Sequence, residues 1–132
     1  MKKQCLYVTI ILLTSFFSNS CGQTENKIDN RKPAEFQELL KTGKDLVLLD
    51  VRTPEEFKEG AIANSVNMDF YASDFADQIS QLDKNKTYLV YCRSGKRSGN
   101  TAKMLLEKGY KNVVNLDGGI NAWQEAGLPV TK

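Results

Sequence analysis

Residues 87–108 constrain the fold of this chain more than any other segment. Thr87–Tyr91 is rich in β-branched and aromatic residues, which predicts a buried strand. The polar run CRSGKRS follows at residues 92–98, and residues 98–108 then have the composition of a helix that ends at Gly109. The sequence therefore predicts a strand that turns sharply into a helix, with Cys92 at the carboxyl end of the strand.

The same alternation of strands and helices extends over the rest of the chain. Residues 46–50 form an unbroken apolar run that ends in an acid, which is typical of a strand buried on both faces of a parallel sheet. Thr53, Pro54 and Glu56 have the spacing of a helix start with reciprocal capping. Further helices are predicted from Pro33 to Gly43, over residues 70–82 and around Trp123, and further strands at residues 65–67 and 113–116. The pattern predicts an α/β fold with a parallel sheet.

The N-terminal segment has a different composition. Lys2 and Lys3 precede an apolar run at residues 6–17, and no charge lies between Lys3 and Glu25. This layout predicts a signal peptide over residues 1–20, or an uncleaved membrane anchor. Ser20-Cys21-Gly22 resembles a bacterial lipoprotein processing site, which would make Cys21 the lipidated residue. We expect an exported, periplasmic or cell-envelope protein, with a polar tether over residues 21–32 and one domain over residues 33–132.

Composition excludes several classes of function. Without Lys2 and Lys3 the basic and acidic residues are equal in number, so nothing favours a nucleic-acid partner. The chain has no histidine, which excludes Cys-His and Ser-His-Asp catalysis and histidine metal sites. The three cysteines lack zinc-ligand spacing, and no glycine-rich nucleotide motif follows a strand. We expect no metal, no cofactor and nothing that requires more than a monomer.

Cys92 is the candidate nucleophile. Cys5 belongs to the predicted signal and Cys21 to the predicted lipid site, which leaves Cys92 unpaired in an exported domain. Loop amides and the positive end of the following helix favour a thiolate and an anionic ligand at this position. The alternative interpretation is a buried cysteine at a strand end, followed by a solvated basic turn.

Several motifs in this order resemble the rhodanese-like domain family. They are Asp50-Val51-Arg52, Glu56-Phe57, Gly60, Ile62, the Cys92 loop, Leu116-Asp117-Gly118-Gly119, Ala122-Trp123, Gly127 and Pro129-Val130. The resemblance implies a central parallel sheet of about five strands with helices on both faces. It also implies sulfur transfer through a persulfide on Cys92, cradled by the backbone amides of residues 93–97. The chain departs from the family at Ala61, where His is usual, and at Asn64, where Gly is frequent.

The loop residues have predicted roles. Lys96 and Arg97 are expected to hold a sulfonate-like anionic donor and to lower the thiol pKa. Arg93 either does the same or faces solvent, and Gly95 permits the backbone turn. Ser94 and Ser98 either donate to the sulfur or cap the helix, and capping is favoured for Ser98.

Residues outside the loop are given structural roles. Asp50 and Arg52 lie at the end of a strand near the predicted loop, and we expect them to form an ion pair that shapes the pocket rim rather than to act in catalysis. Trp123 is expected in the core. Gly118 and Gly119 are expected to serve a turn.

The favoured function is a sulfurtransferase of the thiosulfate:cyanide type, with a thiol or cyanide as acceptor. The alternative is a sulfur-carrier or docking module with little turnover. A cysteine phosphatase of the related fold places Arg six residues after Cys, whereas here Ser98 stands at six and Arg97 at five. Thiol redox activity would need an external thiol to resolve a disulfide.

Overall fold

The computed structural model describes residues 27–132, and this part of the chain builds one five-stranded sheet. The strands are β1 (Asp29–Arg31), β2 (Leu46–Asp50), β3 (Val66–Asn67), β4 (Thr87–Tyr91) and β5 (Val113–Leu116). The helices are α1 (Pro33–Thr42), α2 (Pro54–Glu59), α3 (Phe75–Ser80), α4 (Lys96–Glu107) and α5 (Gly119–Glu125). Strands and helices alternate along the chain, as predicted.

All pairings in the sheet are parallel, in the order β1-β5-β4-β2-β3. The central strand β4 pairs with β2 on one side and with β5 on the other, with Leu49 opposite Val90. Because parallel strands end at the same edge of a sheet, Asp50, Cys92 and Asp117 come together there. In open α/β sheets this edge is where ligands bind.

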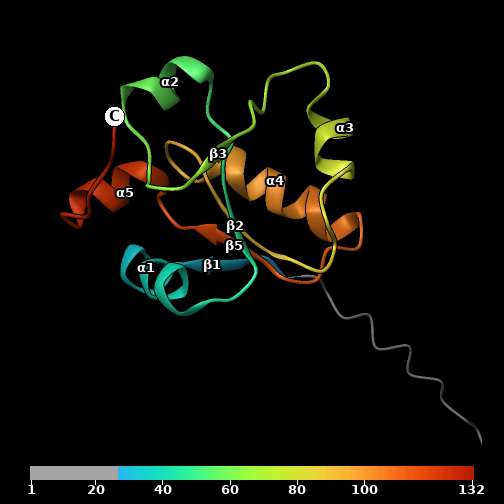
Figure 1. Ribbon diagram of the computed structural model, residues 1–132, viewed down its shortest axis with the longest axis horizontal. Helices are drawn as coiled ribbons and strands as arrows, with labels where there is room; N and C mark the ends of the chain where they lie inside the picture. The colour runs from blue at the N-terminus through green and yellow to red at the C-terminus, as the bar shows by residue number, and fades with distance from the viewer. Residues whose placement is uncertain (1–26) are drawn as a thin grey trace, which may run out of the picture.

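Helices cover both faces of the sheet, which confirms the predicted fold class (Figure 1). Residues of α3 and α4 join one buried cluster with β2 and β4, including Ile79, Leu105 and Val90. Residues of α1 and α5 join a second cluster on the other face, including Phe36 and Trp123. The predicted core position of Trp123 is confirmed, and its ring meets that of Phe36 edge to face at 6.4 Å between centroids.

The start of α2 follows the predicted capping pattern. The Thr53 hydroxyl accepts a hydrogen bond from the Glu56 amide at 3.3 Å, and the Glu56 carboxylate accepts one from the Thr53 amide at 3.0 Å. Pro54 occupies the first helical position, where no amide donor is needed. This reciprocal cap fixes the Glu56 side chain as well as the helix start.

The structure differs from the sequence-based expectation at residues 29–31. They were expected in the polar tether, but they form the edge strand β1, with Asn30 opposite Asn115 in β5. Backbone pairing drives this element, and the Asp117 amide also donates to the Arg31 carbonyl at 2.8 Å. The tether prediction is wrong for these residues, and the predicted segments at residues 1–20 and 21–26 lie outside the described residues.

Two helix boundaries also differ. A helix was expected over residues 70–82, but α3 is confined to Phe75–Ser80. The Asp69 carboxylate accepts a hydrogen bond from the Tyr71 amide at 2.9 Å, which stabilises a turn instead of a helix start there. Helix α4 begins at Lys96, two residues before the expected Ser98.

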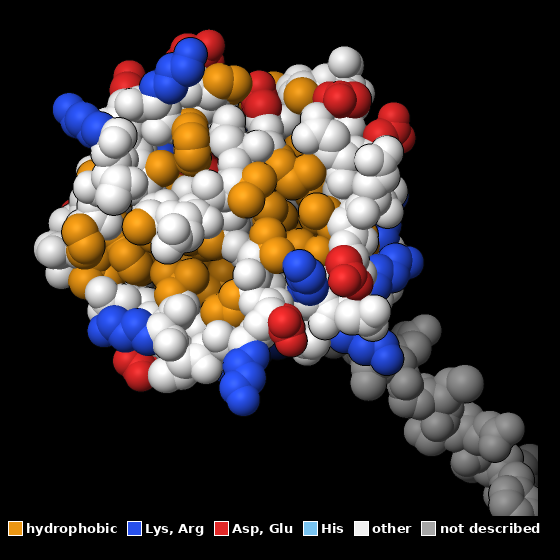
Figure 2. All heavy atoms as spheres, viewed as in Figure 1, with side chains coloured by type: hydrophobic (Ala, Val, Ile, Leu, Met, Phe, Trp, Pro, Cys, Tyr) orange, Lys and Arg blue, Asp and Glu red, His pale blue; other side chains and the backbone are white. Residues whose placement is uncertain are grey.

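On the face seen in Figure 2, hydrophobic side chains gather in two patches, and charged side chains lie mostly around them. Val66 and Tyr71 are the large hydrophobic side chains that residues 27–132 expose most. Within the same residues, every helix is too short or too polar to cross a bilayer.

Candidate active site

The Cys92 sulfur lies at the centre of a tight loop between β4 and α4, and the residue is only 1% exposed. The Gly95 amide donates to Sγ at 3.1 Å, and the Ser98 hydroxyl lies 3.3 Å from it as a second donor. The first turn of the twelve-residue helix α4 begins within this loop. The arrangement surrounds one sulfur atom with neutral hydrogen-bond donors and the positive end of a helix.

This environment favours the thiolate. Burial alone raises the pKa of the Cys92 thiol, but hydrogen bonds from the Ser98 hydroxyl and from the amides of Ser98, Gly95 and Ser94 outweigh it, so that the pKa is lowered. Ser98 therefore acts on the sulfur. The prediction that it caps the helix is wrong, because α4 starts two residues earlier with Gly95 at the cap.

Gly95 and Gly119 allow the loop its shape. Gly95 has φ of 96°, a left-handed conformation that brings its amide onto the sulfur. Gly119 lies directly under the loop, where an added Cβ would meet the carbonyl oxygens of Cys92 and Arg93 at 2.5 Å. A side chain would therefore be strained by the backbone conformation at Gly95, and would displace the loop at Gly119.

Helix α5 holds the outer side of the loop. The Ile120 amide donates to the Cys92 carbonyl at 2.8 Å, and the Asn121 amide donates to the Arg93 carbonyl at 3.1 Å. These bonds turn the loop carbonyls outward and leave its amides directed inward. The sequence predicted a turn at Gly118 and Gly119 but did not reveal this support.

Asp50 and Arg52 form a buried ion pair at the carboxyl end of β2. Arg52 Nη2 lies 2.6 Å from Asp50 Oδ2, and Arg52 Nε lies 3.0 Å from each carboxylate oxygen. Nη2 also donates to the Gly60 carbonyl at 2.7 Å, which ties the end of α2 to the sheet. The pair lies beside the loop as the structural ion pair that the sequence indicated, and no hydrogen bond joins it to Sγ among residues 27–132.

Glu56 is a site residue that sequence reasoning missed. It was predicted only as a cap, but its carboxylate also accepts two hydrogen bonds from Arg97, at 2.8 and 2.9 Å. Those bonds hold the pKa of Glu56 down at about 2. The Arg97 guanidinium is thus bound to a carboxylate rather than to the Cys92 sulfur. The available signals were the reciprocal cap and the Glu56-Phe57 motif, and neither of them identifies Arg97 as the partner of the carboxylate.

The other loop side chains face outward. Arg93 is 64% exposed, with Nε 3.8 Å from Glu56 Oε1, so it follows the solvent-facing alternative. Lys96 and Ser94 are exposed and line a shallow hollow beside β1. Tyr71, also missed from the sequence, is 68% exposed and presents its ring to the Arg97 guanidinium, 5.6 Å from the ring centroid.

The two departures from the family pattern have local explanations. Asn64 has φ of 63°, a left-handed conformation that glycine adopts freely and asparagine tolerates. Ala61 is buried and pairs through its backbone with Thr131, at 2.9 and 2.8 Å. Neither residue touches the Cys92 loop by any hydrogen bond found in residues 27–132.

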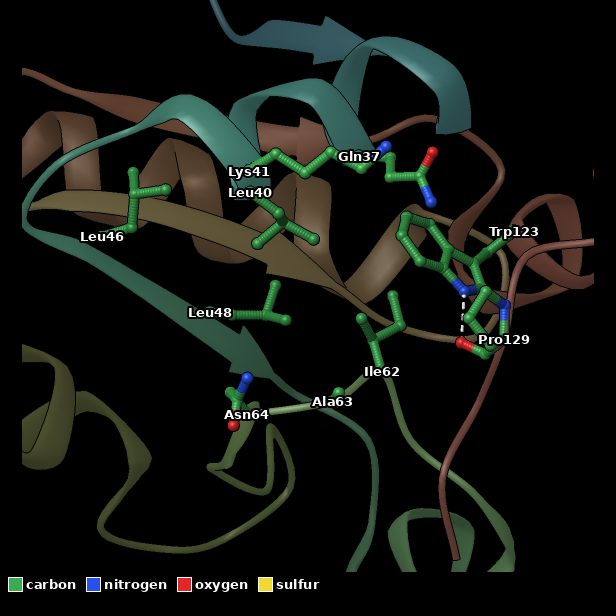
Figure 3. Close-up of a pocket in the computed structure, with 10 residues that line it drawn as sticks. All are labelled: Gln37, Leu40, Lys41, Leu46, Leu48, Ile62, Ala63, Asn64, Trp123 and Pro129. Carbon is green, nitrogen blue, oxygen red and sulfur yellow. Dashed lines mark hydrogen bonds between the residues drawn. The ribbon is translucent and has the colours of Figure 1, made fainter.

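A separate apolar hollow of about 370 Å³ opens between α1, β2 and the segment after α2 (Figure 3). Leu40, Leu48 and Ile62 point toward its interior, and Trp123 closes one end with its ring nitrogen bonded to the Pro129 carbonyl at 2.9 Å. No residue of the Cys92 loop lines it. No cluster of His, Cys, Asp or Glu suited to a metal ion is found in residues 27–132.

Comparison with known proteins agrees with this geometry. Residues 32–126 match the family described as Rhodanese-like domain. A protein named Sulfurtransferase from Allochromatium vinosum is 34% identical over 105 residues, which cover 80% of this chain and 94% of that protein. A "Putative thiosulfate sulfurtransferase, mitochondrial" from Schizosaccharomyces pombe is 34% identical over 137 residues, covering 95% and 96%.

A solved structure shows the same fold. The crystal structure of a rhodanese-related protein from Thermoplasma volcanium superposes with a TM-score of 0.68 at 34% identity, covering 78% of this chain and 97% of that one. The sheet order, the cysteine loop and these relatives agree, and the chain belongs to the rhodanese-like family, of which these two relatives are named as sulfurtransferases.

Proposed function

We propose that this protein transfers a sulfane sulfur through a persulfide on Cys92. The Cys92 thiolate attacks the outer sulfur of a small anionic donor such as thiosulfate, the donor's S–S bond breaks, and sulfite leaves with the electron pair. An acceptor thiolate or cyanide then attacks the outer sulfur of the persulfide and returns Cys92 to the thiolate. The observation that carries the proposal is the ring of donors around a thiol whose pKa is lowered.

The same donors suit the intermediate. A persulfide places its negative charge on the outer sulfur, and fixed amides and a hydroxyl stabilise that charge without giving up a proton. Gly95 and Ser98 are already directed at Sγ, so little rearrangement is needed during the reaction. Lys96 is exposed beside the loop and supplies a positive charge that can guide an anionic donor.

A turnover assay tests the proposal. Wild-type protein with thiosulfate and cyanide should form thiocyanate, and the same reaction with a small thiol as acceptor should form a persulfide product. The variant Cys92→Ser should keep the fold by circular dichroism and lose both activities. Activity retained in Cys92→Ser would refute the mechanism.

A second candidate is a sulfur carrier or docking module with little turnover of its own. The exposed Tyr71 ring beside Arg97 favours it, because an exposed aromatic group next to an arginine of the Cys92 loop is suited to contact with a partner protein. Rapid loading of one sulfur on Cys92, followed by slow discharge to every small acceptor, would favour this function over the first.

We further propose export with a membrane anchor at the N-terminus. The support is the sequence of residues 1–21, with Lys2 and Lys3, a charge-free apolar run and Cys21. Expression in bacteria with labelled fatty acid should label the wild type and leave Cys21→Ser unlabelled. An intact mass that includes residues 1–20 and no lipid would contradict the lipoprotein form.

A further inference from the structure

The two arginines of the Cys92 loop share one carboxylate. Glu56 binds Arg97 through both oxygens, at 2.8 and 2.9 Å, and lies 3.8 Å from Arg93. The Glu56 and Arg97 side chains are 18% and 16% exposed, so the pair is largely shielded from water. A bidentate arginine–carboxylate pair in this setting is stronger and better fixed than a surface ion pair.

We propose that Glu56 determines which ligands the Cys92 loop accepts, because it holds Arg97 away from the reacting sulfur and so leaves the loop selective for sulfur over oxyanions. This inference rests on the proposed sulfur transfer and deepens it by naming a specificity-determining residue.

The pair of Glu56 and Arg97 is held from two sides for this role. The Thr53 amide donates to Glu56 Oε2 at 3.0 Å, so the capping box of α2 holds the carboxylate through a bond that does not involve Arg97. On the other side, the Tyr71 ring faces the Arg97 guanidinium. The guanidinium therefore lies between a carboxylate and an aromatic ring, with both terminal nitrogens used.

The contact with Glu56 reduces the positive charge that Arg97 can offer to a ligand at the loop. A tetrahedral dianion such as sulfate or phosphate is held in proteins by charged, bidentate donors, above all by arginine. Arg97 is the residue next to Ser98, which touches the sulfur, and attraction to Cys92 adds to the rise that the Glu56 hydrogen bonds cause in the pKa of Arg97. Arg97 belongs to the loop and adjoins Ser98, so its guanidinium is the group that an oxyanion at the loop would recruit, and Glu56 competes with that oxyanion for it.

The role of Glu56 can be tested without turnover, because an oxyanion bound at the loop should protect Cys92 from iodoacetamide. Alkylation is followed at Cys92 by peptide mass spectrometry, with sodium sulfate or phosphate added at ionic strength matched by sodium chloride. The wild type should be protected only weakly. Glu56→Gln removes the charge and keeps an oxygen for the cap, and it should be protected at roughly tenfold lower oxyanion concentration, the value of one charge-assisted contact.

Two controls separate this role from a structural one. Glu55→Gln, exposed on the same helix, should behave as the wild type. Adding Arg97→Ala to Glu56→Gln should abolish the gained protection, because the freed guanidinium is its source. Equal protection in Glu56→Gln and wild type, or protection that persists without Arg97, would overturn the proposal.

Kinetics give a second measurement. With thiosulfate as donor, Glu56→Gln should lower KM without raising kcat, since sulfite is also a dianion and is released more slowly from a freed arginine. A raised KM would contradict the assigned role. If neither the wild type nor any variant turns over thiosulfate, the proposed sulfur transfer fails. The alkylation experiment would still decide whether Glu56 restrains Arg97.

Discussion

The Cys92 sulfur receives its hydrogen bonds from neutral groups. Gly95 and Ser98 are directed at Sγ, whereas Arg97 is bound by Glu56 and Arg93 faces outward. Fixed neutral donors do not change their protonation over the working pH range, so the stabilisation that they give the thiolate does not depend on their own titration. The nucleophile is therefore activated by loop geometry more than by the basic side chains that make the loop conspicuous in the sequence.

Replacing Ser98 by alanine tests this division. The Ser98 hydroxyl is the foremost group that lowers the pKa of Cys92, so Ser98→Ala should raise that pKa and slow alkylation at pH 7 by roughly tenfold, the value of one hydrogen bond to a charge. The rate of iodoacetamide alkylation against pH measures both effects. Ser94→Ala is the matched control, because the Ser94 side chain is exposed and only its amide acts on the sulfur. A profile for Ser98→Ala that coincides with the control would contradict the assignment.

At the scale of elements, two helices restrain the loop from opposite sides. Helix α5 binds its carbonyls through the amides of Ile120 and Asn121, and α2 binds Arg97 through Glu56. Helix α2 is held by its reciprocal cap and buries none of its residues, whereas α5 has no side-chain cap and packs Ile120 and Trp123 into the core. The loop geometry thus depends on how α2 and α5 start, and these starts can be tested separately.

Gly119→Ala tests the contact with α5. Gly119 and Gly127 have φ of 61° and 74°, so alanine at either costs about 1–2 kcal/mol of backbone strain. At Gly119 the added Cβ also meets two carbonyl oxygens at 2.5 Å, whereas at Gly127 it meets nothing within 4 Å. We expect Gly119→Ala to lose about 1–3 kcal/mol more in unfolding free energy than Gly127→Ala, measured in urea, and to lose Cys92 reactivity. Equal losses in the two variants would show that the close contact is unimportant.

The ion pair of α2 predicts a pH dependence. The pKa of Glu56 is about 2 in the folded protein, against an ordinary value of 4.5, chiefly because Arg97 donates to it. A depressed folded pKa means that the stabilisation is complete above about pH 4.5 and is lost as the pH falls toward 2. Urea unfolding of wild type and Glu56→Gln should differ by about 1–2 kcal/mol at pH 7, and by much less near pH 2.5. A difference that stays constant over this range would contradict the ion pair.

At the scale of the whole molecule, the sheet brings the site together. The chain segments after β2, β4 and β5 meet at one edge only because all the strands run parallel in the order observed. Strand β1 completes this sheet at its far edge and lies beside the hollow that Lys96 and Ser94 line. Although it has only three residues, it covers an otherwise unpaired strand edge.

Removal of β1 should therefore destabilise the domain. A chain that starts at residue 33 loses the β1–β5 pairing, the bond from Asp117 to Arg31 and the bond from Asn115 to Asn30. Compared with a chain that starts at residue 27, we expect a loss of about 2–4 kcal/mol in unfolding free energy, at about 1 kcal/mol for each hydrogen bond. Equal stabilities would mean that residues 29–31 act as a tether after all.

The fold could be predicted wherever the signal is local. The apolar runs of β2, β4 and β5 and the reciprocal cap at Thr53 and Glu56 each carry their signal within a few residues. Strand β1 could not be predicted, because three polar residues pair through their backbone with a strand 85 residues away. The start of α4 was misplaced because its cap is a left-handed glycine with no side-chain bond.

The candidate site follows the same rule. The position of Cys92 at a strand end and the turn at Gly95 could be predicted from the loop sequence alone. The contact of Glu56 with Arg97 spans 41 residues, and the support from α5 depends on how two loops approach each other. Such contacts are set by the tertiary fold, and no local pattern reports them.

The most direct test of the central claim is the intact mass of the protein before and after thiosulfate. We predict that the wild type gains one sulfur atom on Cys92, that cyanide or a small thiol removes it, and that Cys92→Ser gains none. A folded wild type with a reduced Cys92 that gains no sulfur, or a gain in Cys92→Ser, would contradict the account.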